Sequence, residues 1–295
     1  MPFNETTAWQ ALLALKGHFR NGAGGGSVAI GLSAAGAIDI ARADRAAPLV
    51  VEPDGRWRAS EDPNADVAQM FDLYLPLCAS PPDSTIVIGH LGQSLDGRIA
   101  THSGESQFVN GQANILHLHR LRALCDAVLV GAGTVRHDDP QLTVRHCSGA
   151  TPLRVVIDTN RSLDGHYRLF TDGAAPTLVF CAEDRMTGGE RLGRAEIVGL
   201  PRRGDWLDSS ALLAALAARE VRVLFVEGGG VTVSRFLAAG ALTHLQVTVA
   251  PMIIGSGRPG IDLPRIDSLA DALRPPTRRF LLGEDVMFEC RLDGS

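Results

Sequence analysis

The stretch V-L-F-V-E-G-G-G-V-T-V-S-R-F-L, residues 223–237, decides how this chain folds. Its apolar first half predicts a strand buried on both faces of a parallel sheet, ending at Glu227. Three glycines follow, and then a helix begins. Glycines let the backbone approach a ligand closely, and the unpaired N–H groups of a helix N-terminus attract anions. The stretch therefore predicts a pyrophosphate cradle. Because its spacing matches neither G-x-G-x-x-G nor a Walker loop, a tight structural turn stays open as the alternative.

Two further stretches have a comparable form. In A-V-L-V-G-A-G-T-V-R-H-D-D-P-Q-L-T-V-R, residues 127–145, a buried strand gives way to the small residues 131–134, and Asp138, Asp139 and Pro140 predict a turn. The paired aspartates have no further carboxylates at ligand spacing, so one is expected to cap the turn and neither to hold magnesium. The stretch S-L-D-G-R-I-A-T-H-S-G-E-S-Q-F-V-N-G, residues 94–111, predicts a turn followed by a polar loop.

The alternation of strands and helices extends from residue 84 to the C-terminus. Apolar, β-branched runs predict strands at Ile86–Ile88, Ala127–Val130, Arg154–Ile157, Thr177–Phe180, Val223–Val226, Leu245–Val249 and Val286–Leu292. Helices are expected at Ala113–Leu124, at Ser209–Arg219 with Asp208 or Ser209 as N-cap, and at Thr232–Ala239 with Gly240 as the left-handed residue after it. This order predicts an α/β domain whose ligands bind beyond the carboxyl ends of the strands.

The totals exclude several classes of protein. The chain has 295 residues, and its net charge of −5 provides no positive field that would gather nucleic acid or an anionic membrane. Its five cysteines contain no C-x-x-C pair, which argues against a disulfide scaffold or a zinc knuckle. No secretory signal or membrane-length apolar run is present, so we expect a cytoplasmic protein.

Residues 1–83 have a different pattern, and we treat them as a small α+β N-terminal extension of unknown role. Helices are expected at Ala8–Phe19 and around Ala65–Leu75, with strands at Ser27–Leu32 and Ala47–Glu52. N-G-A-G-G-G-S at 21–27 predicts a loop, since no G-K-[S/T] follows, and P-P-D at 81–83 predicts a linker.

Seven dispersed motifs between residues 84 and 295 resemble one family. They are S-L-D-G-R-I-A-T, G-E-S-Q-F, L-R-A-L-C-D-A-V-L-V-G-A-G-T-V, D-D-P-Q-L-T-V-R, P-L-R-V-V-I-D, V-E-G-G and A-P-M-I-I-G, in this order. The family is the pyrimidine reductase of riboflavin biosynthesis, the reductase domain of the bifunctional deaminase–reductase. The resemblance implies a dihydrofolate-reductase-like, mostly parallel sheet flanked by helices. It also implies a homodimer that uses NADPH to reduce the ribosyl group of a phosphoribosylaminopyrimidine, of the 5-amino-6-(5-phosphoribosylamino)uracil type, to ribityl.

The resemblance also implies roles for individual residues. The residues expected to bind substrate are Ser106, Arg122, Leu142, Arg145 and Glu227, with the two arginines on the phosphate, which guanidinium groups bind bidentately. Glu227 would accept hydrogen bonds from the sugar or the ring. The residues expected to bind NADPH are Gly92, Phe108, Thr134, Asp138, Thr159, Gly229, Gly230, Val231, Thr232, Val233, Ser234 and Arg235. Thr159, with Asn160 and Arg161 nearby, is where a 2′-phosphate would sit.

The chain departs from the family pattern in two ways. His90 stands where many members have a lysine; a histidine there would donate a hydrogen bond or protonate the reacting nitrogen, or it is simply a buried neutral side chain. The deaminase motifs H-x-E and P-C-x-x-C do not occur in residues 1–83, so we expect no deamination and no metal site. A same-fold reductase acting on another heterocycle and an inactive nucleotide-binding module stay open as alternatives.

Overall fold

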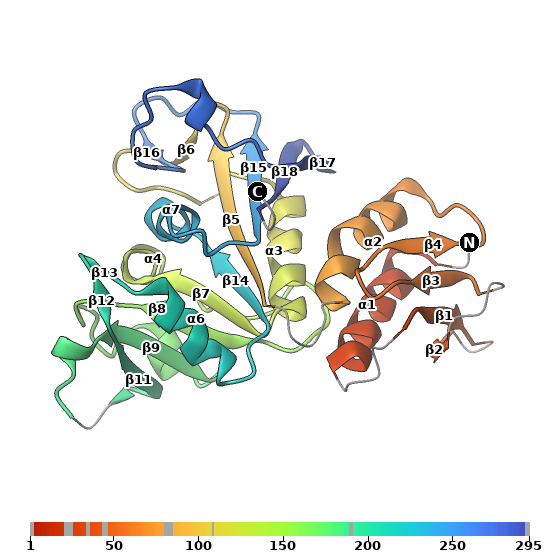
Figure 1. Ribbon diagram of the computed structural model, residues 1–295, viewed down its shortest axis with the longest axis horizontal. Coiled ribbons are helices and arrows are strands. Elements are labelled where there is room, and N and C mark those ends of the chain that lie inside the picture. The colour runs from red at the N-terminus through yellow and green to blue at the C-terminus, as the bar shows by residue number, and fades with distance from the viewer. Residues whose placement is uncertain are drawn as a thin grey trace. The chain divides into compact units, whose positions relative to one another are not determined.

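The computed structural model describes residues 3–20, 26–33, 36–42, 47–79, 85–107, 109–188 and 191–292. Phe108, the expected linker at 81–83 and most of the expected loop at 21–27 lie outside the described residues. The chain divides into two compact units, Met1–Ile86 and Val87–Ser295, which are described separately here (Figure 1).

The N-terminal unit is a four-stranded antiparallel sheet with two helices. Its elements are α1 (Glu5–Arg20), β1 (Val28–Leu32), β2 (Ile38–Arg42), β3 (Leu49–Val51), β4 (Trp57–Ala59) and α2 (Ala65–Cys78), with strand order β2-β1-β3-β4. The rings of Trp9 and Tyr74 meet edge to face at 5.9 Å between the two helices. The indole of Trp57 donates to Asp72 over 2.8 Å and so joins β4 to α2. The short strands β2 and β4 were not predicted.

The C-terminal unit is built on a ten-stranded sheet. Its strands are β5 (Ile86–Ser94), β7 (Ala127–Gly131), β8 (Leu153–Ile157), β9 (Thr177–Ala182), β10 (Arg191–Leu192), β11 (Ala195–Leu200), β14 (Val223–Glu227), β15 (His244–Ala250), β17 (Thr277–Leu282) and β18 (Asp285–Arg291). Their order is β10-β11-β9-β8-β7-β14-β5-β15-β18-β17. The pairs among β11, β9, β8, β7 and β14 are parallel, as is β5 with β15, whereas β17, β18 and β10 run antiparallel to their neighbours.

The helices and smaller strands of this unit flank the sheet (Figure 1). The helices are α3 (Gln112–Leu124), α4 (Ala132–Asp138), α5 (Arg168–Thr171), α6 (Ser209–Ala217) and α7 (Gly230–Ala238). Two small antiparallel sheets accompany them: β6 (Arg98–Ala100) pairs with the distant β16 (Arg258–Pro259), and β12 (Arg202–Arg203) forms a hairpin with β13 (Trp206–Leu207). Single turns of 3-10 helix lie at Glu183–Arg185 and Leu269–Asp271. Asp208 caps α6 by accepting from the amide of Ala211 over 2.8 Å, as predicted. Gly240 follows α7 with φ +63°, also as predicted.

The core lies where the central strands are buried on both faces. Every residue of β7 and β9 is buried. Leu212 and Leu216 of α6 and Phe236 of α7 belong to the same hydrophobic core as residues of these strands. The fold class predicted from the sequence, a mostly parallel sheet flanked by helices with a small N-terminal unit, is therefore confirmed. One local prediction is wrong: residues 132–138, interpreted as a run of small residues leading to a turn, form the helix α4, which ends at Asp139 in the left-handed conformation.

Candidate active site

One cavity of about 870 Å³ opens at the carboxyl ends of the central strands. The segments that line it follow β7, β8 and β14 directly, and β5 adds residues 90–92. Such a volume is in the upper part of the range that holds small ligands and cofactors. In an open α/β sheet the carboxyl ends of parallel strands are where ligands are expected. Residues from the stretches 94–111, 127–145 and 223–237, which the sequence singled out, all line this cavity.

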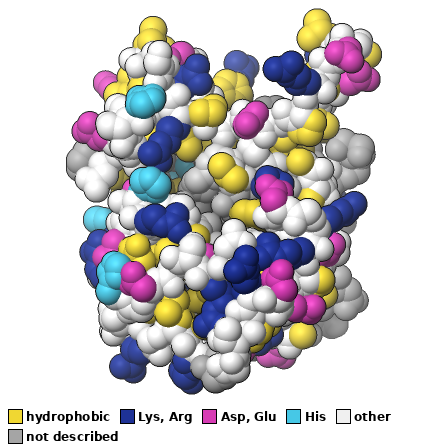
Figure 2. Space-filling model, turned by 90° about the vertical axis from the view of Figure 1, so that its left-hand side faces the viewer, with side chains coloured by type: hydrophobic (Ala, Val, Ile, Leu, Met, Phe, Trp, Pro, Cys, Tyr) yellow, Lys and Arg dark blue, Asp and Glu magenta, His cyan; other side chains and the backbone are white. Residues whose placement is uncertain are grey.

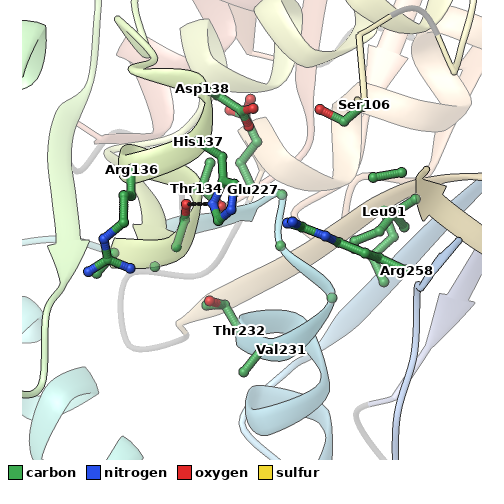
Figure 3. A pocket seen from close by; sticks show the side chains of 18 of the residues that line it. Leu91, Ser106, Thr134, Arg136, His137, Asp138, Glu227, Val231, Thr232 and Arg258 are labelled. Carbon is green, nitrogen blue, oxygen red and sulfur yellow. Dashed lines mark hydrogen bonds between the residues drawn. The ribbon is translucent and has the colours of Figure 1, made fainter. Parts of the chain in front are cut away.

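The two glycine-containing turns approach each other closely. A Cβ atom built on Gly131 would lie 2.5 Å from the hydroxyl of Thr232, and one on Gly229 would lie 3.0 Å from the hydroxyl of Thr134. Gly229 also has φ +63°, a conformation that favours glycine. The end of β7 with α4 and the end of β14 with α7 thus face a common space, and side chains at these glycines would fill it (Figure 3).

Most of the residues expected to bind a dinucleotide lie on this cavity. Those that line it are Gly92, Thr134, Asp138, Thr159, Gly229, Gly230, Val231, Thr232 and Arg235. Val233 is fully buried in the core, and Ser234 accepts a hydrogen bond from the amide of Asp262 over 2.9 Å, so neither is among the described residues of the cavity wall. At Gly92 a Cβ atom would overlap the side-chain oxygen of Asn110, which lies on the cavity wall beside it.

The end of the cavity near Thr159 holds polar atoms that lack partners. The hydroxyl oxygen of Thr159 and the indole nitrogen of Trp206 are buried without a hydrogen-bond partner, although both residues line the cavity. Burying such groups costs free energy unless a ligand satisfies them. Arg136 also lines this end and donates to the hydroxyl of Ser162 over 2.7 Å. Arg161, which the sequence placed near this position, instead donates to the carbonyl of Arg185 and the hydroxyl of Thr187.

Glu227, at the end of β14, is paired with Arg122 of α3. Arg122 Nε donates to Glu227 Oε2 over 2.8 Å, and Nη2 donates to Oε1. The third guanidinium nitrogen donates to the carbonyl of Thr143 over 3.1 Å. The two side chains are 9% and 14% exposed, so this is a mostly buried, bidentate ion pair. Glu227 lines the cavity, and Arg122 holds its carboxylate in place there.

Arg145, another of the substrate residues predicted from the sequence, lies close enough to Arg122 for their charges to interact. Arg145 donates to the hydroxyl of Thr143 over 2.6 Å, and its backbone amide donates to the ring of His119. Burial and the charges of Arg122 and Arg168 lower the pKa of Arg145. Mutual repulsion among these cations would be relieved by a bound anion. Leu142 is buried beside them with φ +53°. Among the described residues, Ser106 and Glu227 are the members of the predicted substrate set that line the cavity.

His90 lies within a buried hydrogen-bond network on the cavity wall. Its Nε2 is 3.1 Å from both Asn114 Oδ1 and Thr248 Oγ1, and Thr248 donates to the same Asn114 oxygen. Since that oxygen only accepts, Nε2 carries the proton. Burial lowers the pKa of His90 to about 4, so the imidazole is neutral near pH 7. This geometry fits the alternative of a buried neutral histidine rather than a cationic proton donor.

Among the cavity residues that the sequence did not identify are Arg136, Trp206 and Arg258. The guanidinium carbon of Arg235 lies over the indole of Trp206, 5.8 Å from the centre of that ring. Arg235 also forms an ion pair with Asp205. The arginine in the glycine-rich run G-S-G-R-P-G, which begins at the last residue of the A-P-M-I-I-G motif, could have indicated Arg258. The sequence around Arg136 and Trp206 gives no such signal.

Two features are absent from the described part of the chain. No group of three or more His, Cys, Asp or Glu side chains is arranged there to hold a metal ion. No helix among the same residues is both long and apolar enough to span a bilayer. On the face that Figure 2 shows, basic and acidic side chains are interspersed rather than gathered by sign.

Comparison with known proteins shows which family the chain resembles. The family model described as "RibD C-terminal domain" matches residues 85–278. A 2,5-diamino-6-ribosylamino-4(3H)-pyrimidinone 5′-phosphate reductase from Methanothermobacter thermautotrophicus is 36% identical over 216 residues, which cover 70% of this chain and 98% of that protein. The riboflavin biosynthesis protein RibD of Bacillus amyloliquefaciens is 34% identical over 164 residues, which cover 55% of this chain and 44% of that protein. The chain therefore spans less than half the length of that second relative.

A solved structure gives the same result. The diaminohydroxyphosphoribosylaminopyrimidine deaminase/5-amino-6-(5-phosphoribosylamino)uracil reductase of Thermotoga maritima superposes with a TM-score of 0.60 at 25% identity, covering 77% of this chain and 61% of that one. The family match covers well over half of the chain and begins where the strands of the large sheet begin. The chain belongs to the family of RibD C-terminal domains, the pyrimidine reductases of riboflavin biosynthesis.

Proposed function

We propose that this protein is an NADPH-dependent oxidoreductase that reduces the ribosyl group of a phosphoribosylaminopyrimidine to ribityl. The substrate is of the 5-amino-6-(5-phosphoribosylamino)uracil type. The observation that carries the proposal is that the glycine turn at 228–230 and the carboxylate of Glu227 face one cavity of about 870 Å³. A dinucleotide and a second ligand bound to these consecutive residues would be held against each other.

The residues of the cavity fit a nicotinamide dinucleotide. The first amides of α7 and the glycines before it would hold the pyrophosphate, and the unpartnered hydroxyl of Thr159 would bind the far end. When bound, the cofactor would supply a hydride to C1′ of the open-chain imine of the substrate, and the imine nitrogen would take up one proton from solvent. The protein would align the two carbons. Glu227, fixed by Arg122, accepts hydrogen bonds from the substrate, and neutral His90 keeps Asn114 and Thr248 in place.

Parallel assays test the function and name the substrate. NADPH oxidation is followed with 5-amino-6-(5-phosphoribosylamino)uracil and with its 2,5-diamino-pyrimidinone counterpart, which differs in one ring substituent. Turnover of either one supports the proposal and identifies the ring that the site accepts. Dinucleotide binding without turnover of either would overturn the substrate class, and the absence of both would overturn the reductase itself.

Replacing Arg145 with alanine tests the phosphate end of the substrate site. We expect KM for the phosphorylated substrate to rise by more than about tenfold, because a charge-assisted hydrogen bond is lost, while KM for NADPH is unchanged. Steady-state kinetics with each substrate varied in turn provides the measurement. Equal effects on the two KM values would remove Arg145 from the phosphate site.

Replacing Arg136 with glutamine tests the preference for NADPH over NADH. Arg136 is a cation at the cavity end that contains Thr159 and Ser162, where a 2′-phosphate would sit. The ratio of kcat/KM for NADPH to that for NADH is expected to fall by about tenfold or more. Arg161→Gln is the matched control, because its guanidinium donates to Arg185 and Thr187. An unchanged ratio in the Arg136 variant would assign the 2′-phosphate to other residues.

The homodimeric state and the cytoplasmic location belong to this proposal as well. Both rest on the resemblance and on the sequence pattern.

A further inference from the structure

Arg258 is a cation placed inside the cavity by local structure. It lies on β16, where it pairs with Ala100 of β6. Its guanidinium extends along the backbone of Gly104, since a Cβ atom built there would lie 2.8 Å from Nη2. Figure 3 shows the side chain pointing into the cavity, toward the side of Glu227. Any side chain in place of Gly104, which has φ +99°, would displace it.

This guanidinium has no protein partner among the described residues. Several other arginines of the C-terminal unit, such as Arg154 and Arg235, form ion pairs with aspartates. For Arg258 the structure gives neither a hydrogen bond nor an ion pair, and its charge is felt more distantly by Asp138. A guanidinium partly withdrawn from water is unfavourable unless an anion meets it. Its planar array of donors suits a phosphate group in particular.

Two surfaces near Arg258 would present a phosphate to it. One is the loop that carries Ser106, whose hydroxyl faces Asp138 across the cavity (Figure 3). The other is the N-terminus of α7: a Cβ atom on Gly230 would lie 2.7 Å from the carbonyl oxygen of Pro259, so the residue after Arg258 touches the expected pyrophosphate cradle. Arg258 therefore stands between the two parts of the site.

We propose that Arg258 is a phosphate-binding residue of this cavity, in addition to the arginines that the family resemblance assigns. The proposal rests on the function proposed above. The phosphate comes either from the dinucleotide pyrophosphate or from the ribose 5-phosphate of the substrate, and the two sources share one chemistry. In both cases Arg258 adds a positive charge on the cavity wall itself, whereas Arg122 and Arg145 do not line the described part of that wall.

The test compares Arg258→Gln with Arg265→Gln, which removes an exposed arginine of the same segment that does not line the cavity. The dissociation constant of NADPH alone is measured by calorimetry, and KM is measured for the phosphorylated pyrimidine. A rise of about tenfold or more in the first constant assigns Arg258 to the pyrophosphate; the same rise in the second assigns it to the substrate phosphate. Arg258→Lys, which keeps the charge but loses the planar donors, is expected to show an intermediate effect and serves if the glutamine variant does not fold.

If both constants in Arg258→Gln match those of Arg265→Gln, the proposal is overturned. Protection of the wild-type protein against thermal unfolding by inorganic pyrophosphate gives an independent reading. We expect this protection to be lost in Arg258→Gln and kept in Arg265→Gln. The wild-type protein could be protected by pyrophosphate and yet bind no dinucleotide and reduce neither pyrimidine. That result would overturn the proposed function and leave Arg258 as an anion-binding residue. Equal protection of both variants, together with an unchanged KM for the pyrimidine, would overturn the role of Arg258 alone.

Discussion

Replacing Gly230 with alanine is expected to weaken dinucleotide binding by about ten- to a hundredfold, because inserting one methyl group into a closed contact costs about 1–3 kcal/mol. The added Cβ atom would lie 2.7 Å from the carbonyl oxygen of Pro259 and also against that of Gly260. Both obstacles are backbone atoms, which cannot rotate away as a side chain end can. The first turn of α7 must therefore separate from residues 259–260, and its amides leave the position where they face the cavity.

Calorimetric titration with NADPH and a thermal melt measure this effect together. Gly17→Ala is the control, since Gly17 lies within α1 and a Cβ atom there meets no atom within 4 Å. The same chemical change at that site should leave dinucleotide affinity unaltered and stabilise the helix slightly. Wild-type affinity in Gly230→Ala would mean that the N-terminus of α7 does not hold the cofactor.

The second large effect is expected at the ion pair between α3 and β14. Arg122→Met leaves the carboxylate of Glu227 without its partner in a mostly buried place, and breaking such a pair costs about 3–5 kcal/mol of stability. We expect reduction of the pyrimidine to be lost at the same time. Urea unfolding gives the free energy, and kcat/KM gives the activity.

The double variant Arg122→Met/Glu227→Met separates structure from function. Apolar side chains of similar volume often replace a buried ion pair without loss, so most of the stability should return. Activity should stay absent, because no acceptor faces the substrate. Glu227→Gln keeps the shape and one acceptor, and is expected mainly to weaken substrate binding. Undiminished stability in the single Arg122→Met variant would contradict the role assigned to the pair.

The sequence predicted the central strands because these strands are apolar on both faces and short. It missed β17, where Arg278 and Arg279 stand in the strand at the edge of the sheet, because an edge strand buries less of its surface and its pattern is less apolar. It also missed α4, since Gly131–Thr134 is poor in the residues that favour helices, and contacts with β7 and β8 override that weak preference.

At the site, local pattern gave the glycine turns and the family resemblance gave the arginines and Glu227. Neither could show that Arg122 faces Glu227, because the two are 105 positions apart and meet only through the packing of α3 on β14. The protonation state of His90 could not be predicted from the sequence either, because it depends on the burial of that ring against Asn114 and Thr248.

The placement of Glu227 directly before Gly228 and Gly229 has a thermodynamic consequence. Glu227, expected to bind the substrate, and the glycines expected to bind the dinucleotide belong to one tight turn. Its glycines, Gly228 and Gly229, have φ values of +66° and +63°. A shift of the backbone at Glu227 is therefore expected to move the glycines that follow it, and the reverse. Occupancy by either ligand should therefore alter the affinity for its companion, and by linkage the factor must be the same in both directions.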